Sequence, residues 1–321
     1  GGKTLLDTAV FIMMFPKLTS GPIARYDELM PSVRSAEPSL KTVSRGLLTF
    51  TLGLGMKVLL ANRIGQVWSD AGNVGYDSIS TPMAWLSLIS YAMQLYFDFA
   101  GYSVMAIGLG EMLGFELPEN FNDPYLSKSV TEFWRRWHIT LGRWFKDYIY
   151  IPLGGSRAGS LKTISSLLIV WLFTGLWHGA GWSFVIWGLY LFLFILLEKL
   201  FLKKYLDRYP VFGHIYLVVV ILLSWVFFAV GDMGDAAVFL MRLFGIEIAG
   251  ANIFPGDFLR FQPITYILMA VGLLFCTGLP FKWFRKYKET PAMAVIMLAI
   301  FWFSVYSLYM SAGDPFMYFN F

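Results

Sequence analysis

Long stretches of uncharged apolar residues recur along this chain, and they constrain its fold more than any other feature. Read with a window of about 19 residues, the apolar segments are 45–62, 83–113, 161–177, 182–201, 212–231, 264–281 and 292–310, with a partial one at 5–16. Only 14% of the residues are charged, whereas a soluble domain usually carries about 25%. The pattern predicts an all-α integral membrane protein with several spans.

No internal repeat or low-complexity linker divides the sequence, so we expect one membrane domain over residues 1–321. The chain opens with Gly1 and Gly2 rather than Met, and its first apolar stretch is too short and mixed for a signal peptide. We therefore expect a chain that lacks N-terminal spans. Cys276 is the only cysteine, which excludes an internal disulfide and a cysteine-based metal site.

Basic and non-basic loops alternate along the sequence, as the positive-inside rule requires of a membrane protein. The loops with clusters of Lys and Arg are 17–45, 114–162, 199–210 and 282–291. The other connections are 63–82, 178–181, 232–262 and the C-terminus. We expect the first group on the cytoplasmic side of the inner (cytoplasmic) membrane and the second group outside.

Residues 132–157, EFWRRWHITLGRWFKDYIYIPLGGSR, combine many charges with many aromatic side chains. On one helix over 132–148, the charged side chains share an arc of roughly 120°, opposite an aromatic face. The cations are Arg135, Arg136, Arg143, Lys146 and, after a glycine turn, Arg157. Such an amphipathic helix lies in the membrane interface or lines a wet cavity. A lipid anchor and a site for phosphates both fit, and the glycine turn fits either a phosphate cradle or a plain turn.

Two isolated ionisable residues lie within the apolar segments. Asp98 belongs to 83–113, which exceeds the ~20 residues of one span and therefore predicts a broken or re-entrant helix. It is either a functional residue or a packed carboxylate bonded to hydroxyls. His178 lies among Trp177 and small residues, which leave room either for a substrate beside the imidazole or for close helix packing. A buried histidine with a structural role also fits.

Several of these segments together resemble one known family. The run TEFWRRWHITLGRWFKDYIYIPLGGSR, followed by GLWHGAGWSF, resembles the membrane-bound O-acyltransferase (MBOAT) family, in its branch of alginate and peptidoglycan O-acetyltransferases. The segments FPKLTSGPIARYDEL, YFDFAGYSVMAIGLGEMLGFELPENFNDPYLSKSVTEF and DPFMYFNF are similar to that branch as well. The resemblance extends from about residue 11 to the C-terminus and is strongest over 94–188.

The resemblance implies a multi-span helical bundle in which re-entrant and amphipathic helices surround a transmembrane tunnel. The catalytic histidine of the family's W-H-G motif falls on His178, and the histidine of its R-W-H motif falls on His138. Some alginate members carry a further W-H-G about fourteen residues later. Here that stretch reads WGLYLF, so no third histidine is assigned.

The implied chemistry is acyl transfer, with acetyl as the expected group, from a cytoplasmic thioester to hydroxyls of an extracytoplasmic polysaccharide or cell-wall polymer. We expect His178 to be the general base, because neutral imidazole can accept a hydroxyl proton near pH 7. Candidate oxyanion donors are His138, Trp177 and backbone amides. The cations of 132–157 would draw in the donor, and the tryptophans would seat the helix in the bilayer interface.

The donor would be acyl-CoA or an acyl-carrier thioester, and we expect no cofactor, no metal and no nucleic-acid partner. An extracytoplasmic acetyltransferase could relay the acyl group to the polymer. Two other functions remain open. A polytopic transporter could use an intramembrane Asp and a His, although no symmetric halves are visible. A non-catalytic membrane scaffold for an extracellular acyltransferase would tolerate loss of His178.

Overall fold

The computed structural model describes residues 4–17, 21–157, 159–246, 248 and 250–311. Every regular element within these residues is helical, which confirms the predicted all-α class. The α-helices are α1 Leu5–Met13, α2 Tyr26–Arg34, α3 Leu40–Gly55, α4 Asn62–Ile64, α5 Gln66–Val74, α6 Thr81–Met112, α7 Val130–Arg136, α8 Ile139–Phe145, α9 Ser160–His178, α10 Trp182–Leu197, α11 Lys203–Arg208, α12 Pro210–Ala229, α13 Met233–Leu243, α14 Pro263–Cys276, α15 Leu279–Tyr287 and α16 Pro291–Met310. Three π-helical turns (Met56–Ala61, Lys146–Tyr150 and Glu198–Leu202) and three 3₁₀ turns (Phe15–Lys17, Pro124–Leu126 and Asp257–Leu259) complete the described structure.

Five helical stretches within the described residues are long and apolar enough to cross a membrane. They are Leu40–Val74, Ser160–His178, Trp182–Arg208, Pro210–Ala229 and Pro291–Met310. Each overlaps an apolar segment predicted from the sequence, although Leu40–Val74 continues past 45–62 into the predicted connection 63–82, and the predicted segment 83–113 is not among the five. The chain is therefore a multi-span membrane protein.

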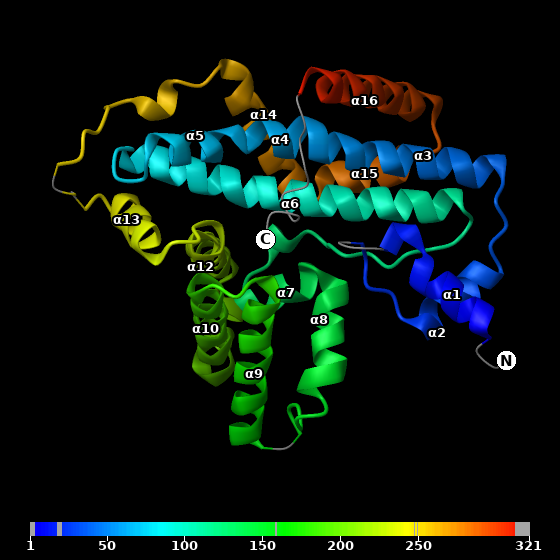
Figure 1. Ribbon diagram of the computed structural model, residues 1–321, viewed down its shortest axis with the longest axis horizontal. Helices are drawn as coiled ribbons and strands as arrows, with labels where there is room; N and C mark the ends of the chain where they lie inside the picture. The colour runs from blue at the N-terminus through cyan, green and yellow to red at the C-terminus, as the bar shows by residue number, and fades with distance from the viewer. Residues whose placement is uncertain (1–3, 18–20, 158, 247, 249, 312–321) are drawn as a thin grey trace.

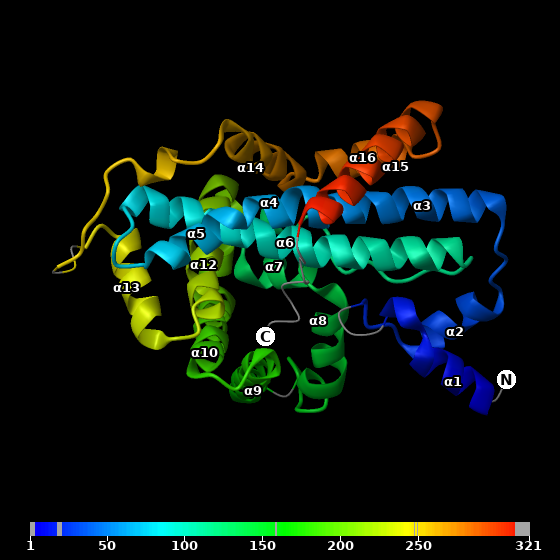
Figure 2. The ribbon, with the colours of Figure 1, turned by 45° about the horizontal axis from the view of Figure 1, so that its top comes forward.

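Helix α6 is the longest element, and it is continuous. The prediction of a broken or re-entrant helix over 83–113 is wrong, because Thr81–Met112 forms 32 residues of unbroken helix. Figure 1 shows α6 lying alongside α3, α4 and α5 in one layer, and Figure 2 shows the same arrangement from a second direction. Glycines allow this close approach: a methyl group at Gly53 would lie 2.5 Å from the carbonyl oxygen of Gly101.

A sharp bend interrupts the segment predicted as one span at 264–281. Helices α14 and α15 meet there at 73°. Gly278 lies at the break with φ +70°, a left-handed conformation that favours glycine, and Pro280 then occupies the N-terminal turn of α15. Continuous helix over 264–281 is thus corrected to a bent pair.

The prediction of one amphipathic helix over 132–148 is also wrong, because the segment forms two helices. Helix α7 ends at Arg136, and α8 begins at Ile139 after His138 adopts a left-handed backbone with φ +44°. Helix α8 and the turn after it run antiparallel to α9. The Trp144 ring lies 6.3 Å from that of Trp177 near the end of α9, and the later Leu153 carbonyl accepts a hydrogen bond from the earlier Ser166. The break carries His138 into the protein interior.

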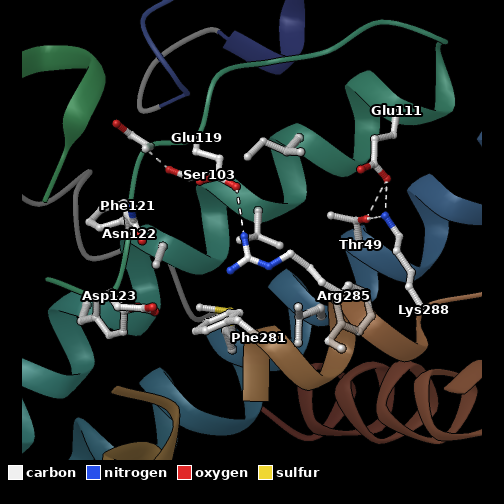
Figure 3. Close-up of a pocket in the computed structure, with 18 residues that line it drawn as sticks. Thr49, Ser103, Glu111, Glu119, Phe121, Asn122, Asp123, Phe281, Arg285 and Lys288 are labelled. Carbon is white, nitrogen blue, oxygen red and sulfur yellow. Dashed lines mark hydrogen bonds and ion pairs between the residues drawn. The ribbon is translucent and has the colours of Figure 1, made fainter. Parts of the chain in front are cut away.

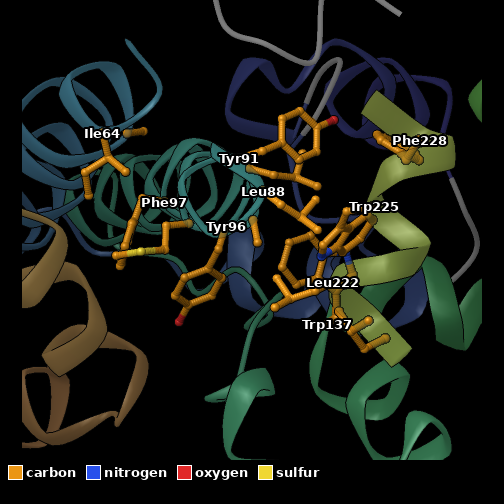
Figure 4. Close-up of a cluster of buried hydrophobic side chains, with 14 of the residues drawn as sticks. Ile64, Leu88, Tyr91, Tyr96, Phe97, Trp137, Leu222, Trp225 and Phe228 are labelled. Atoms are coloured by element: carbon orange, nitrogen blue, oxygen red, sulfur yellow. The ribbon is translucent and has the colours of Figure 1, made fainter. Parts of the chain in front are cut away.

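An aromatic core joins α7 to α9, α10 and α12. The Trp137 ring lies 5.4 Å from that of Trp225, and the Trp134 ring lies 5.2 Å from that of Trp171. Figure 4 shows Trp137 beside Trp225 among the buried side chains. Trp137 is buried and Trp134 is partly buried against the same core. The prediction that these two tryptophans seat a helix in the bilayer interface is therefore wrong, since they pack between helices.

Polar contacts join some loops within each predicted set, whereas the loop 114–162 also approaches the 178–181 connection, since the Trp144 ring lies 6.3 Å from that of Trp177 and His138 interacts with His178. Arg143 forms an ion pair of 2.8 Å with Glu28, joining two of the basic loops. Asp257 accepts a hydrogen bond of 2.8 Å from the backbone N–H of Ser80, joining two of the non-basic connections. Residues 312–321, predicted to lie outside, fall beyond the described residues. Which set faces the cytoplasm stays a prediction.

Candidate active site

His138 occupies the break between α7 and α8, in the polar part of the interior. Its residue is 9% exposed, and its ring lies edge-on to Phe99 of α6, with 4.7 Å between centroids. His138 Nδ1 lies 3.0 Å from Asn120 Oδ1. A non-glycine residue with positive φ is uncommon and costs about 1–3 kcal/mol, and such residues cluster at functional sites.

His178 is the last residue of α9, and aromatic rings surround it. Its ring lies 5.2 Å from that of Trp187 on α10 and 5.1 Å from that of Phe228 on α12. The residue as a whole is partly buried. The packing holds the ring at the junction of three helices.

The small residues near His178 serve helix packing. A methyl group at Gly175 would lie 2.4 Å from the carbonyl oxygen of Phe184, and one at Gly179 would lie 2.4 Å from the Phe184 ring. Of the two alternatives, close packing is the one that the structure displays at these positions. The space beside these backbones is filled by α10.

The two histidines lie close enough to interact electrostatically. Burial, together with the positive charge that His178 can carry, lowers the pKa of His138 to about 3. His138 lies outside the candidate spans and His178 ends one of them. A pair of imidazoles, supplied by α9 and by the break after α7, is an arrangement suited to moving protons.

Trp177 and Arg157 have exposed side chains. Trp177 is 59% exposed, and its ring lies 6.5 Å from that of Phe145 on α8. Arg157 ends the turn that follows α8, whose Gly155 carbonyl accepts a hydrogen bond from Thr163 at the start of α9. This turn is thus tied to α9.

The predicted basic arc divides into paired and exposed cations. Arg136 forms an ion pair of 2.7 Å with Glu132, and Arg143 pairs with the carboxylate of α2 described above. Arg135 and Lys146 are exposed, as is Arg157. Only the exposed three keep their charge readily available to an anionic ligand.

Asp98 forms an ion pair with a lysine that sequence reasoning missed. Lys57 Nζ lies 2.5 Å from Asp98 Oδ1, with side chains 8% and 3% exposed. Lys57 lies in the π-helical turn Met56–Ala61. The signal was present in the sequence, since two opposite charges in neighbouring apolar segments must pair or pay a desolvation cost.

A cavity of about 180 Å³ lies between α3, α6 and α15. Figure 3 shows its rim, where Arg285 pairs with Glu119 (3.2 Å) and Lys288 with Glu111 (2.7 Å). Its lining also includes Asn120, the residue that contacts His138. Asn120 therefore contacts the buried imidazole and also borders this cavity. Sequence reasoning did not identify Asn120, because its contact with His138 depends on how the loop before α7 folds back.

Comparison with known proteins gives a consistent result. The model of the membrane-bound O-acyltransferase family matches residues 4–208. The chain is 33% identical to the "Probable alginate O-acetylase" of Pseudomonas putida over 344 aligned positions, which cover 99% of this chain and 70% of that protein.

Two further relatives match shorter parts. The peptidoglycan O-acetyltransferase of Helicobacter pylori is 45% identical over 187 residues, which cover 57% of this chain and 35% of that protein. The teichoic acid D-alanyltransferase of Bacillus subtilis is 30% identical over 191 residues, which cover 56% of this chain and 48% of that protein. The matched stretch is thus half or less of the length of these two relatives.

Proposed function

The chain belongs to the membrane-bound O-acyltransferase family, and we propose that it moves an acetyl group from a thioester to hydroxyls of an extracytoplasmic polysaccharide or cell-wall polymer. The observation that carries the proposal is that both motif histidines border one aromatic core: Trp137, next to His138, and Trp187, against His178, both pack on Trp225. The names of relatives acting on alginate and on peptidoglycan support this class of acceptor.

His178 is the general base of the proposed reaction. Its imidazole accepts the proton of the attacking hydroxyl, the hydroxyl oxygen bonds to the carbonyl carbon, and the carbon–sulfur bond then breaks. The proton leaves with the thiolate as a free thiol, so the enzyme is regenerated. His178 lies at the end of α9 and is partly buried, which supports its access to substrates.

The donor is acyl-CoA or an acyl-carrier thioester that reaches the site from the cytoplasm, and the reaction needs no cofactor or metal. Arg135, Lys146 and Arg157 are the cations proposed to attract its phosphates or an acidic carrier. Arg136 and Arg143 hold the helices to their acidic neighbours and contribute less, because their charges are already compensated. The bound donor passes along a tunnel between the helices towards His178.

The protein is proposed to reside in the cytoplasmic membrane, with the acceptor polymer outside. An extracytoplasmic acetyltransferase acts as a relay if the polymer itself cannot reach His178, and both routes begin with attack on the same thioester. The alternation of basic loops supports this direction of transfer.

The experiment is turnover of acetyl-CoA by the purified protein in lipid nanodiscs, with free thiol as the readout, alongside mass spectrometry of surface polymers from cells with and without the gene. Acetyl-CoA cleavage that depends on His178, together with loss of O-acetyl groups from one polymer, is expected. Full polymer acetylation in cells that carry only His178→Ala would instead indicate a scaffold.

A further inference from the structure

Asn120 makes the hydrogen bond that orients the imidazole of His138. Its side chain is 1% exposed and lies in the segment between α6 and α7. Asn120 Oδ1 lies 3.0 Å from His138 Nδ1, 2.9 Å from Thr140 Oγ1 and 3.3 Å from the backbone nitrogen of Thr140. Asn120 Nδ2 donates to Ser103 Oγ of α6 at 3.2 Å. The amide is therefore bonded on both of its ends.

The surroundings fix which end of the amide faces the histidine. A backbone N–H can only donate, so the amide atom that faces the Thr140 N–H must be the oxygen. The Thr140 hydroxyl accepts a hydrogen bond from the backbone N–H of Ile23 at 3.0 Å, which leaves its own hydrogen for Asn120 Oδ1. The backbone N–H and the hydroxyl of Thr140 both donate to this position, so the Asn120 atom there must be the amide oxygen, which accepts.

An amide oxygen has no hydrogen to give, so His138 Nδ1 must carry the hydrogen of that bond. Burial keeps the imidazole neutral by lowering the pKa of His138 to about 3. A neutral imidazole has one N–H, and here it is on Nδ1. Nε2 is consequently left with a lone pair and no hydrogen.

We propose that Asn120 is a positioning residue that holds His138 as the Nδ1–H tautomer, so that His138 Nε2 serves the reaction as an acceptor. The consequence for catalysis rests on the proposed acyl transfer, whereas the tautomer does not. A neutral His138 in this state cannot donate from Nε2 to an oxyanion. It can accept a hydrogen bond from a substrate hydroxyl or from a protonated His178.

The same side chain also borders the cavity between α3, α6 and α15. Any group that entered the cavity and bonded to the Asn120 amide would compete with the bonds that hold His138. The orientation of the His138 ring and the basicity of its Nε2 therefore depend on the hydrogen bond from Nδ1–H to Asn120. In this structure the acceptor is an amide and not a carboxylate. An asparagine leaves Nε2 less basic than an aspartate would, because it adds no negative charge.

Nitrogen-15 NMR of the protein labelled at histidine, in nanodiscs near pH 8, reads the tautomer directly. The chain has three histidines, so His→Gln variants assign each signal. His214 is an internal reference, since its Nδ1 lies 2.9 Å from the carbonyl oxygen of Ser127, which can only accept. His138 should show the same pattern as His214, with a protonated Nδ1 and a bare Nε2.

Substitutions of Asn120 then connect the tautomer with turnover. Asn120→Leu removes the acceptor and should give a mixture of tautomers with a loss of about 10²-fold in kcat. Asn120→Asp keeps an acceptor and should keep the Nδ1–H tautomer, with turnover restored to within about 10-fold of wild type. Asn73→Leu, the same change at an exposed position of α5, is the matched control and should resemble wild type.

The proposal is overturned if wild-type His138 carries its hydrogen on Nε2, a result that needs no variant. It is also overturned if Asn120→Leu retains a pure Nδ1–H tautomer while turnover falls, because the asparagine would then be only structural. If no thioester turnover occurs with any acceptor, the proposed function fails while the tautomer is still read from the spectrum.

Discussion

Lys57 Nζ lies 2.5 Å from Asp98 Oδ1, and this ion pair is buried between α6 and the π-helical turn that follows α3. Removing one partner of a buried pair leaves an uncompensated charge and typically costs about 3–5 kcal/mol. Asp98→Ala and Lys57→Met should each lower the thermal unfolding midpoint in detergent strongly. The Lys57→Met/Asp98→Leu double variant should be closer to wild type, because no lone charge remains.

The same variants decide whether Asp98 binds substrate. If the role of Asp98 is structural, the folded Lys57→Met/Asp98→Leu variant should keep the wild-type KM for donor and acceptor. An unchanged melting curve for Asp98→Ala, combined with a raised KM, would restore the substrate-binding interpretation.

The exposed cations of the region 135–157 are expected to act on the donor. Arg135→Glu combined with Lys146→Glu should raise KM for acetyl-CoA several-fold with little change in kcat, and high salt should diminish the difference. Lys204→Glu on α11, an exposed cation of another basic loop, is the matched control. Equal donor KM in all three proteins would mean that the pair of cations only contacts lipid.

Topology is tested by cysteine labelling from either side of the membrane. In a Cys276→Ser background, Lys204→Cys should react only with reagent on the cytoplasmic side, and Asn252→Cys only with reagent outside. Both positions are exposed. Labelling of the two cysteines from one side would refute the alternation of loops.

Acid should destabilise the protein through His138. The unfolded imidazole binds a proton below about pH 6.5, whereas burial lowers the pKa of His138 in the folded state to about 3. Between these values the unfolded chain binds more protons, so stability falls as the pH falls. From pH 6.5 to 5 the contribution of this group is about 2 kcal/mol. Unfolding of wild type and His138→Gln across that range should show a steeper loss in wild type; parallel curves would place His138 in a solvated site.

Hydropathy predicted most of the spans because each apolar segment carries its own signal. It wrongly predicted a break in 83–113, because the segment is longer than one span and length alone does not show whether a helix continues. The sidedness of the loops stays a prediction, because contacts within each set do not fix it and the loop 114–162 also approaches the end of α9.

The break at His138 escaped prediction because helical periodicity continues through it, with apolar and charged residues keeping their spacing on both sides. Two tryptophans were assigned to lipid because sequence alone does not distinguish an interface from an aromatic core. The motif histidines were located by resemblance, whereas Asn120 could be found only from the way the loop before α7 folds back onto His138.

The most direct test of the account is acetyl transfer by His178→Ala and His178→Gln at membrane abundance equal to wild type. Loss of a general base typically lowers the rate about 10²–10⁴-fold, and glutamine should not restore it, because an amide cannot accept the proton. Both variants should insert normally and barely acetylate. Acetylation at the wild-type rate by His178→Ala would contradict the central claim that this imidazole is the base.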